Sequence, residues 1–380
     1  MNKPFPLTAA TISLREAVPP NASEADRMMA AKAQGLMEGY DARWLDAGWN
    51  TIAVEHEFHL PIVNPKTSAK SRSFTQAGKY DGIIEHNRRP GVPYLLEHKT
   101  TSEDVTDPNA MYWRRLAIDS QVSAYVLANW QDGMKLEGTL YDVIRKPGIR
   151  AKKLSKAELA SFVASGVYFG KRFDRDVQIE FSSGREVETP EMYGARLAHD
   201  CKERPEWYFQ RRIIPRLDTD VVEYAEELWD VAAEIRTAKQ TGRWFRNSGA
   251  CMTYNTPCPY LGICSGHSTV DDGRWTRREK QHSELNVIGQ DVLTHSSMSC
   301  FKTCRRRYYY RYVEGIERID EEESEALRFG DLIHRSLEAW WKCFMVSAPE
   351  VHNEHDCTTG NEPAVSGAGS QTELVGQDQF

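Results

Sequence analysis

Two carboxylates and a lysine lie close together in the stretch 79–101, which reads KYDGIIEHNRRPGVPYLLEHKTT. Asp81 ends one strand-like run. Because successive side chains of a strand point to opposite faces, Glu97 and Lys99 lie on the same face of the next run. Carboxylates on adjacent strands repel each other unless a divalent cation joins them, and hard oxygen ligands suit Mg²⁺ or Mn²⁺. Such a cation polarises a phosphodiester and acidifies a bound water, while Lys99 orients that water or stabilises the phosphorane charge. The triplet alone is a weak signal, because solvated charges at strand ends are common.

A hairpin is expected to position these residues. Extended segments at 74–86 and 92–98 are separated by Asn87–Gly91, whose Asn, Pro and Gly suit a hairpin connection. The other expected elements are a helix at 24–45 capped by Ser23, strands at 51–61 and 136–144, helices at 114–130 and 155–169, a helix–strand–helix unit over 185–242 with its strand at 207–214, and two helices within 293–345.

The bulk composition excludes several classes of protein. With 40% hydrophobic and 27% charged residues, the chain has the balance of a soluble globular protein. No apolar run approaches the length of a membrane span, and the N-terminus lacks a basic-then-apolar leader, so we expect a cytoplasmic protein without a membrane partner. The net charge is −7, so basic residues must gather locally if the chain binds nucleic acid. No Walker-type phosphate loop is apparent, which argues against a helicase or ATPase.

Three cysteines, Cys251, Cys258 and Cys264, lie within fourteen residues in the spacing Cys-x6-Cys-x5-Cys. In a cytosolic protein such a cluster argues against disulfides and for metal or iron–sulfur ligation. With a fourth ligand, these thiolates could hold Zn²⁺ or an iron–sulfur cluster.

The segment 118–128, IDSQVSAYVLA, adds Gln121 and Tyr125 one helical turn apart. The order Asp, Glu-x-Lys, Gln-x-x-x-Tyr resembles the PD-(D/E)XK nuclease superfamily, particularly the RecB-like branch that includes phage exonucleases and CRISPR-adaptation nucleases. The resemblance implies an α/β fold with a restriction-endonuclease-like core, in which a mixed central sheet is flanked by helices, and an iron–sulfur-bound cap. It also implies that Gln121 sits against the metal site and Tyr125 near the nucleic acid.

The usual opening segment of such a nuclease stands near the far end of this chain. Residues 293–341 contain LTHSSMSCFKTCRRRYYYRYVEGIE and ALRFGDLIHRSLEAWW, which resemble that opening. The resemblance implies that His334, with Gly330 as its motif partner, joins Asp81 and Glu97 at the metal. It implies a [4Fe–4S] cluster, with zinc as the alternative, held by Cys251, Cys258, Cys264 and Cys304. Cys300 rivals Cys304, and the first gap of six residues departs from the usual pattern, so the cluster type stays open.

Three explanations account for the displaced order. The domain is circularly permuted, with 293–345 folding back onto 24–264; or the C-terminal piece starts a truncated second copy; or it completes a neighbouring protomer by swapping. A gene fragment would give the same order. The fold-back is favoured because a shared cluster would hold the normal termini close together, and the 39 residues between Cys264 and Cys304 have ample reach. The expected organisation is a flexible lead-in at 1–22, a nuclease core with the cysteine cluster at 23–270, a linker at 271–292, the displaced segment at 293–346 and a disordered tail at 347–380.

Basic and aromatic residues alternate in CRRRYYYRY, residues 304–312. Arginine binds phosphate and tyrosine can stack on an unpaired base, although a charge run is more often a solvated face. The candidate DNA contacts are Arg305, Arg306, Arg307, Tyr308 and Lys146, with Arg145, Arg211 and Arg212 as weaker ones.

Residues and resemblance together predict a Mg²⁺- or Mn²⁺-dependent deoxyribonuclease, of exonuclease type, with Asp81, Glu97, Lys99, Gln121 and Tyr125 at its catalytic site. Single-stranded or duplex DNA ends in recombination, repair or phage DNA processing are the expected substrates, and a recombination protein or helicase the expected partner. The alternatives are a catalytically incomplete iron–sulfur DNA-binding module and a zinc-stabilised scaffold. The nuclease and the DNA-binding module differ in whether His334 approaches Asp81 and Glu97.

Overall fold

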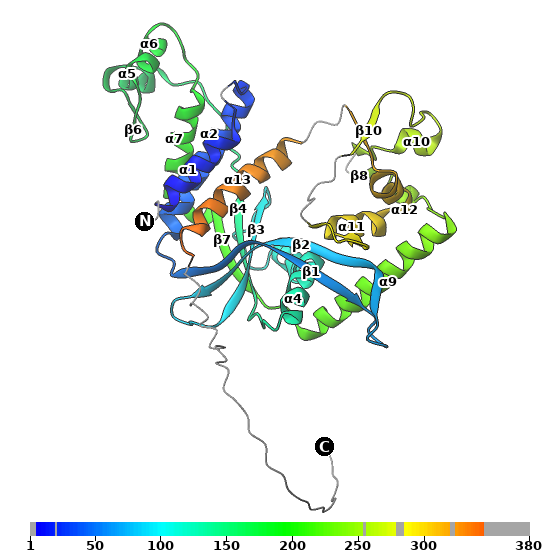
Figure 1. The fold of residues 1–380 in the computed structure, drawn as a ribbon. Coiled ribbons are helices and arrows are strands. Elements are labelled where there is room, and N and C mark those ends of the chain that lie inside the picture. The colour runs from blue at the N-terminus through cyan, green and yellow to red at the C-terminus, as the bar shows by residue number, and fades with distance from the viewer. Residues whose placement is uncertain (1–4, 20, 254–255, 279–284, 320–323, 346–380) are drawn as a thin grey trace, which may run out of the picture. The chain divides into compact units, whose positions relative to one another are not determined.

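A six-stranded mixed sheet forms the centre of the fold (Figure 1). Its strands are β1 (Trp49–Val63), β2 (Lys70–His86), β3 (Pro93–Thr101), β4 (Thr139–Arg145) and β7 (Phe209–Ile214), in the order β1-β2-β3-β4-β7, and β11 (Asp291–Leu293) pairs with β2. The computed structural model describes residues 5–19, 21–253, 256–278, 285–319 and 324–345. Strands β1, β2 and β3 are antiparallel neighbours, whereas β3 and β4 run parallel and β4 and β7 antiparallel. The predicted mixed sheet flanked by helices is therefore present.

The side chains on the two faces of the sheet pack into two hydrophobic cores. Leu95 and Tyr141 point into one core, which contains α4 (Ser120–Gln131), α9 (Asp218–Thr241) and α11 (His295–Thr303). Leu96 and Leu140, the neighbouring residues, point into the other core. That second core contains four helices: α1 (Pro6–Ala17), α2 (Glu24–Trp44), α7 (Pro190–Glu203) and α13 (Glu325–Lys342). Both faces of the sheet are thus covered by helices, which explains the continuous apolar runs in β3 and β4.

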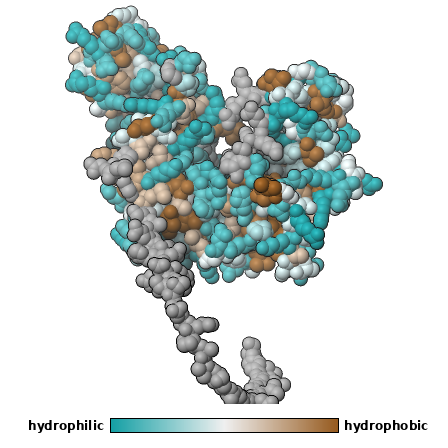
Figure 2. Space-filling model, viewed as in Figure 1, coloured by the Kyte–Doolittle hydropathy of each residue, from teal (hydrophilic) through white to brown (hydrophobic). Residues whose placement is uncertain are grey.

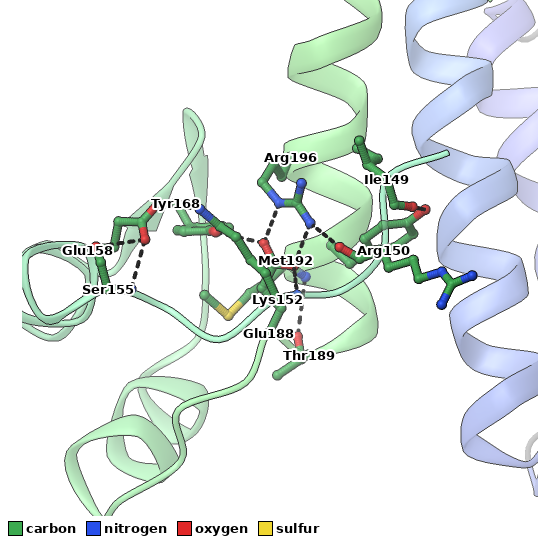
Figure 3. Close-up of polar contacts among 11 residues, drawn as sticks. Ile149, Arg150, Lys152, Ser155, Glu158, Tyr168, Glu188, Thr189, Met192 and Arg196 are labelled. Carbon is green, nitrogen blue, oxygen red and sulfur yellow. Dashed lines mark hydrogen bonds and ion pairs between the residues drawn. The ribbon is translucent and has the colours of Figure 1, made fainter. Parts of the chain in front are cut away.

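A small satellite core lies between β4 and α7 in the sequence. It contains α5 (Lys156–Ser165), α6 (Arg175–Ser182) and the short pair β5 (Val167–Tyr168) and β6 (Lys171–Arg172). Figure 3 shows the buried Glu188 that ties this unit to α7: Arg196 donates two hydrogen bonds to its carboxylate, at 2.6 and 2.8 Å, and Tyr168 donates a third at 2.7 Å. A charge removed from water in this way is stable only with such partners.

The remaining elements are short, and most of them lie in the cysteine-rich loop and the C-terminal segment. They are α3 (Met111–Leu116), α8 (Pro205–Tyr208), η1 (Ser248–Ala250), β8 (Met252–Thr253), β9 (Thr256–Pro257), α10 (Leu261–Ser265), β10 (Trp275–Arg277), α12 (Arg305–Tyr308), η3 (Tyr309–Val313) and β12 (Ile316–Arg318).

Three sequence-based expectations need correction. The lead-in predicted as flexible contains α1, whose Ala10 and Leu14 are buried in the core with α13, a helix far away in sequence. The predicted linker at 271–292 contains β10, which pairs with β12, and the start of β11. The single helix predicted at 114–130 is two helices, because Asp119 caps α4 by accepting a hydrogen bond from the Gln121 amide at 3.0 Å. The predicted tail at 347–380 lies outside the described residues.

The surface carries mainly hydrophilic residues on the face shown in Figure 2, with hydrophobic residues in small groups. Within the described ranges, no helix combines the length and apolar character that crossing a membrane requires.

Candidate active site

The antiparallel register of β2 and β3 brings Asp81 and Glu97 together. The paired residues run from Glu85↔Pro93 to Gly82↔Leu96, and Asp81 and Glu97 come next on the two strands. The ladder ends at this point, and the backbone N–H of His98 donates a hydrogen bond to Asp81 Oδ2 at 2.6 Å instead. Asp81 lies within the long strand β2, not at its end as the sequence suggested, but it does lie where β2 and β3 separate.

Lys99 lies on the same face as Glu97 and contacts three side chains. Its Nζ donates hydrogen bonds to Glu97 Oε1 at 2.6 Å and Gln121 Oε1 at 3.1 Å, and it lies 3.7 Å from Asp119 Oδ2. Gln121 in turn donates to the Tyr125 hydroxyl at 2.6 Å. The start of α4 therefore presents Gln121 and Tyr125 to the carboxylate and lysine of β3.

Burial sets the charge states of this group. The Glu97 carboxyl is 4% exposed, and burial together with the neighbouring Asp81 raises the pKa of Glu97 to about 7. Burial opposes the charge on Lys99, but Glu97 and Asp119 outweigh it, so the pKa of Lys99 lies above its ordinary value. Burial also raises the pKa of Tyr125. The site therefore holds more negative charge than its lysine neutralises.

His334 reaches the same site from α13. Its Nδ1 lies 3.6 Å from Asp81 Oδ1, and its ring centroid lies 6.0 Å from that of His98. Burial alone would lower the pKa of His334, but Asp81 overcomes this effect and holds it above the ordinary value. Conversely, His334 and His98 hold the pKa of Asp81 below its ordinary value against the effect of burial. Gly330, one turn earlier on α13, lies over Thr100 of β3.

The donor set fits a divalent cation in its chemistry, although its present spacing is not that of a coordination shell. Among the described residues, no three His, Cys, Asp or Glu side chains are grouped so that they could hold a metal ion. Glu97 is engaged by Lys99, and Asp81 by the His98 amide. The buried Glu97 and the partly buried Asp81, whose charge opposes the ionisation of Glu97, nevertheless make a site that a divalent cation would stabilise.

Glu55 is a further acid at this site that the sequence did not reveal. It lies between the pairs Val54↔Gly82 and His56↔Tyr80, which puts it across from Asp81 on the other side of β2. Its φ of 51° is in the left-handed region, and its carboxylate pairs with Lys79 at 3.1 Å. Burial raises the pKa of Glu55, and Asp81 adds to this rise. A glutamate within an alternating strand gives no sign of such a backbone conformation, so no sequence pattern could have singled it out.

The four predicted cluster cysteines are free thiols that influence one another electrostatically, but among the described residues no three of them are grouped closely enough to hold a metal ion. Burial raises the pKa of Cys264, and the thiols of Cys258, Cys304 and Cys251 act on it in the same direction, while Arg306 opposes them. The Cys304 sulfur accepts a hydrogen bond from the Asn247 amide at 3.5 Å. Cys300, the rival ligand, is also close enough to interact with Cys304 and Cys258, and burial raises its pKa to about 11.

Most of the predicted DNA contacts have partners within the protein. Arg305 pairs with Glu234 at 2.7 Å, and Arg306 donates to the Trp244 carbonyl at 2.7 Å. Lys146 lies 3.5 Å from the Ala326 carbonyl. Arg307 acts electrostatically on the thiols of Cys258 and Cys300. The prediction that Tyr308 stacks on a base is wrong for this structure, because its ring is 4% exposed and stacks on Trp244 in the core.

The weaker basic candidates follow the same trend. Arg211 is buried and bonded to Asp142, and Arg212 donates to the Pro108 carbonyl at 2.8 Å. Arg145 pairs with Asp104 at 3.2 Å and lies over the Trp207 ring. Charge alternation in sequence was misleading because the segment 304–312 is helical and turns part of its arginine and tyrosine side chains inward.

Comparison with known proteins gives one finding. No match was found among curated proteins or among solved structures. Residues 292–366 match the family model described as PD-(D/E)XK nuclease superfamily. Its members are nucleases that typically use Mg²⁺ or Mn²⁺. The matched segment includes α11 and α13 with His334, so the similarity to PD-(D/E)XK nucleases is found in this segment, and the mixed α/β sheet is consistent with their fold.

Proposed function

We propose that this chain is a Mg²⁺- or Mn²⁺-dependent deoxyribonuclease of the RecB-like type that hydrolyses phosphodiester bonds at DNA ends. One observation carries the proposal: His334, from the segment that matches the nuclease family, lies 3.6 Å from Asp81, beside Glu97 and Lys99. Residues from β2, β3, α4 and α13 would have no structural need to gather two buried carboxylates, a lysine and a histidine at one point. Exonuclease action in recombination, repair or phage DNA processing is the proposed setting.

Asp81, Glu97 and His334 would hold the cation, which when bound supplies Lewis acidity and lowers the pKa of a coordinated water. Lys99 is placed to hold the attacking water and to stabilise the charge that develops on the phosphate oxygens. Gln121 fixes the lysine, since its carbonyl accepts from Lys99 Nζ and its amide donates to Tyr125. Tyr125 remains a protonated phenol, because burial raises its pKa.

The cysteines Cys251, Cys258, Cys264 and Cys304 are proposed to hold a [4Fe–4S] cluster, with zinc as the alternative. The electrostatic influence of these thiols on one another supports this ligand set, although the structure does not group three of the described cysteines as a metal site, and Arg306 and Arg307 favour the thiolate form that ligation needs.

A second candidate is a catalytically incomplete iron–sulfur module that binds DNA in a repair or recombination complex. The spacing of the donor residues favours it, since no three of them lie in coordination geometry among the described residues. The two candidates differ in one measurable respect, which is metal-dependent cleavage.

Cleavage of labelled single- and double-stranded DNA with Mn²⁺ tests the proposal. Lys99→Ala should lower the rate by about 10²–10³-fold or more, because it removes the ammonium group proposed to stabilise the charge that develops on the phosphate oxygens. His334→Ala should also lower the rate and raise the Mn²⁺ concentration needed. Lys135→Ala, at an exposed loop position, is the matched control and should cleave like the wild type. Equal cleavage by wild type and Lys99→Ala would exclude the proposed mechanism, and no cleavage by the wild type would favour the DNA-binding module.

Point substitutions are preferred to a truncation near residue 285. Such a truncation would remove α13, whose Ile333, Leu337 and Trp341 are buried in the core with α1 and α2. Lost activity would then report unfolding and not the role of His334.

A further inference from the structure

A buried polar cluster lies behind the proposed catalytic strand, on the face of the sheet opposite Glu97 and Lys99. We call it the back-face cluster. Its five side chains come from five elements: Tyr40 of α2, His98 of β3, Asp142 of β4, Arg211 of β7 and Trp341 of α13. Asp142 and Tyr40 have no exposed surface, and Trp341 and His98 are 1% and 4% exposed. No part of the proposed reaction uses these groups directly.

Three members form one row across three strands. His98 pairs in register with Asp142, and Asp142 pairs with Arg211. Arg211 Nε donates a hydrogen bond to Asp142 Oδ1 at 3.0 Å, and His98 Nδ1 lies 3.2 Å from Asp142 Oδ2. The carboxylate is therefore held from both sides, which keeps the pKa of Asp142 below its ordinary value against the effect of burial.

Tyr40 connects this row to α13. Its hydroxyl donates to Asp142 Oδ2 and accepts from Arg211 Nη2 at 2.7 Å. It also accepts from the Trp341 indole N–H at 3.1 Å. The helix that carries His334 is thus attached to the sheet through a directional polar contact as well as through apolar packing.

Stability alone does not explain these charges. Replacing a buried ion pair by apolar side chains of similar volume is often neutral or stabilising, because desolvation offsets the Coulomb attraction. The directional hydrogen bonds from Tyr40, Arg211 and Trp341 impose one geometry, which apolar packing imposes less strictly, although His98 Nδ1 and Arg211 Nη1 have no hydrogen-bond partner.

Two connections lead from the cluster to the active site. The His98 amide donates to Asp81 Oδ2 at 2.6 Å, while the His98 ring faces the cluster. Trp341 lies seven residues, or two helical turns, after His334 and so on the same side of α13. The His98 ring centroid is 6.0 Å from that of His334 and 6.2 Å from that of Trp341.

We propose that the back-face cluster fixes α13 in one position against β3, and that Tyr40 is a positioning residue for His334 and Asp81. Its consequence for metal binding rests on the proposed function, whereas its effect on α13 does not. Through the cluster, α2, β3, β4 and β7 hold α13, and with it His334, beside Asp81.

Tyr40→Phe is the variant that tests this role. It keeps the ring, whose edge-on contacts with Phe209 and Trp340 are 5.9 and 5.1 Å between centroids, and removes only the hydroxyl. Tyr208→Phe is the matched control, because Tyr208 is also buried and its hydroxyl also contacts an aspartate, Asp200, away from the cluster. Circular dichroism establishes that both variants are folded.

Two measurements on the full chain follow. Hydrogen–deuterium exchange should show faster exchange of the α13 amides around 334–341 in Tyr40→Phe, by about tenfold or more, and no change in Tyr208→Phe. The EPR signal of free Mn²⁺ gives the Mn²⁺ affinity without DNA, and we expect it to fall about tenfold in Tyr40→Phe only, in the range seen for groups that orient ligands. In the cleavage assay the half-saturating Mn²⁺ concentration should rise by a similar factor, with the rate at saturating Mn²⁺ much less affected.

Unchanged exchange of α13 would overturn the proposal. Faster exchange with unaltered Mn²⁺ affinity would overturn the positioning role and leave a structural one. If the wild type neither binds Mn²⁺ nor cleaves DNA, the proposed function fails, but the exchange measurement still decides whether the cluster holds α13.

Discussion

Three acids form a row across the strands at the site: Glu55 on β1, Asp81 on β2 and Glu97 on β3. Lys79 pairs with the first, His334 approaches the second and Lys99 bonds the third. Each acid has its own basic partner, yet burial and mutual repulsion still raise the pKa of both Glu55 and Glu97. At the scale of single residues, the site is an acidic row held inside a folded protein at an electrostatic cost.

That cost has a defined pH dependence. The pKa of Glu97 is about 7 in the folded chain, against an ordinary value of 4.5. Its carboxyl therefore keeps its proton up to about pH 7. The folded state therefore binds more protons than the unfolded state between these values, so stability falls as the pH rises through this interval. Glu97→Gln removes the ionisation, and without metal it should be more stable than the wild type at about pH 8, by about 1–3 kcal/mol, with little difference below pH 4.5.

Urea denaturation in the presence of a chelator measures this difference. Glu103→Gln, at a half-exposed acid just beyond β3, is the control and should change stability by less than about 0.5 kcal/mol at either pH. A wild-type stability that does not vary across the interval would contradict the electrostatic description of Glu97.

Local patterns made part of the site predictable. Glu97, Lys99, Gln121 and Tyr125 are related by strand alternation or by one helical turn, and the structure places these four in contact as a connected group. Glu55 was not predictable, because only a long-range strand register and a left-handed backbone conformation place it at the site. Tyr308 was assigned wrongly because composition does not tell which side of a short helix faces the core.

At the scale of elements, α2 and α7 pack closely because glycines lie at their contact. A Cβ on Gly35 would lie 2.7 Å from the Gly194 carbonyl oxygen, and one on Gly39 would lie 2.4 Å from Cys201 Cβ. Neither distance is tolerated between ordinary side chains and backbone. The glycines therefore weaken each helix on its own but allow the helix pair to support β3 and β4 from behind.

Gly39→Ala consequently should destabilise the protein, although alanine is the better helix former. We expect a loss of about 1–3 kcal/mol in the free energy of unfolding from the overlap with Cys201 and Phe209. Chemical denaturation measures it. Gly148→Ala is the control, because a Cβ there meets no atom within 4 Å, and it should be neutral or slightly stabilising. Equal effects of the two substitutions would show that the contact relaxes.

Elements with a strong local pattern were predictable, and those defined by distant partners were not. The helix expected at 24–45 is observed as Glu24–Trp44, and the predicted hairpin strands are β2 and β3. By contrast, α1 is a short helix that packs on α13, and the three-residue strand β11 is defined by its pairing with β2. No window of sequence contains both partners of such a contact.

At the scale of the whole molecule, the cysteine group joins the loop 251–264 to Cys304 of the displaced segment. If it binds a cluster, Cys304→Ser should reduce bound iron to about a tenth or less of the wild-type content, whereas Cys300→Ser should keep it. Elemental analysis of the purified protein measures iron and zinc together. The opposite result would assign the ligand to Cys300, zinc in place of iron would identify the alternative, and metal loss in neither variant would overturn the site.

Parallel pairing of β11 with β2, and packing of α13 on α1, have a consequence for how the protein is made. The partners of each contact are far apart in sequence, so the element that is synthesised earlier lacks its partner until the later one has been made. Contacts of such long sequence separation slow folding and leave apolar surface exposed in the meantime. We therefore expect nascent chains of this protein to expose apolar surface, and to be prone to aggregation, until α13 emerges.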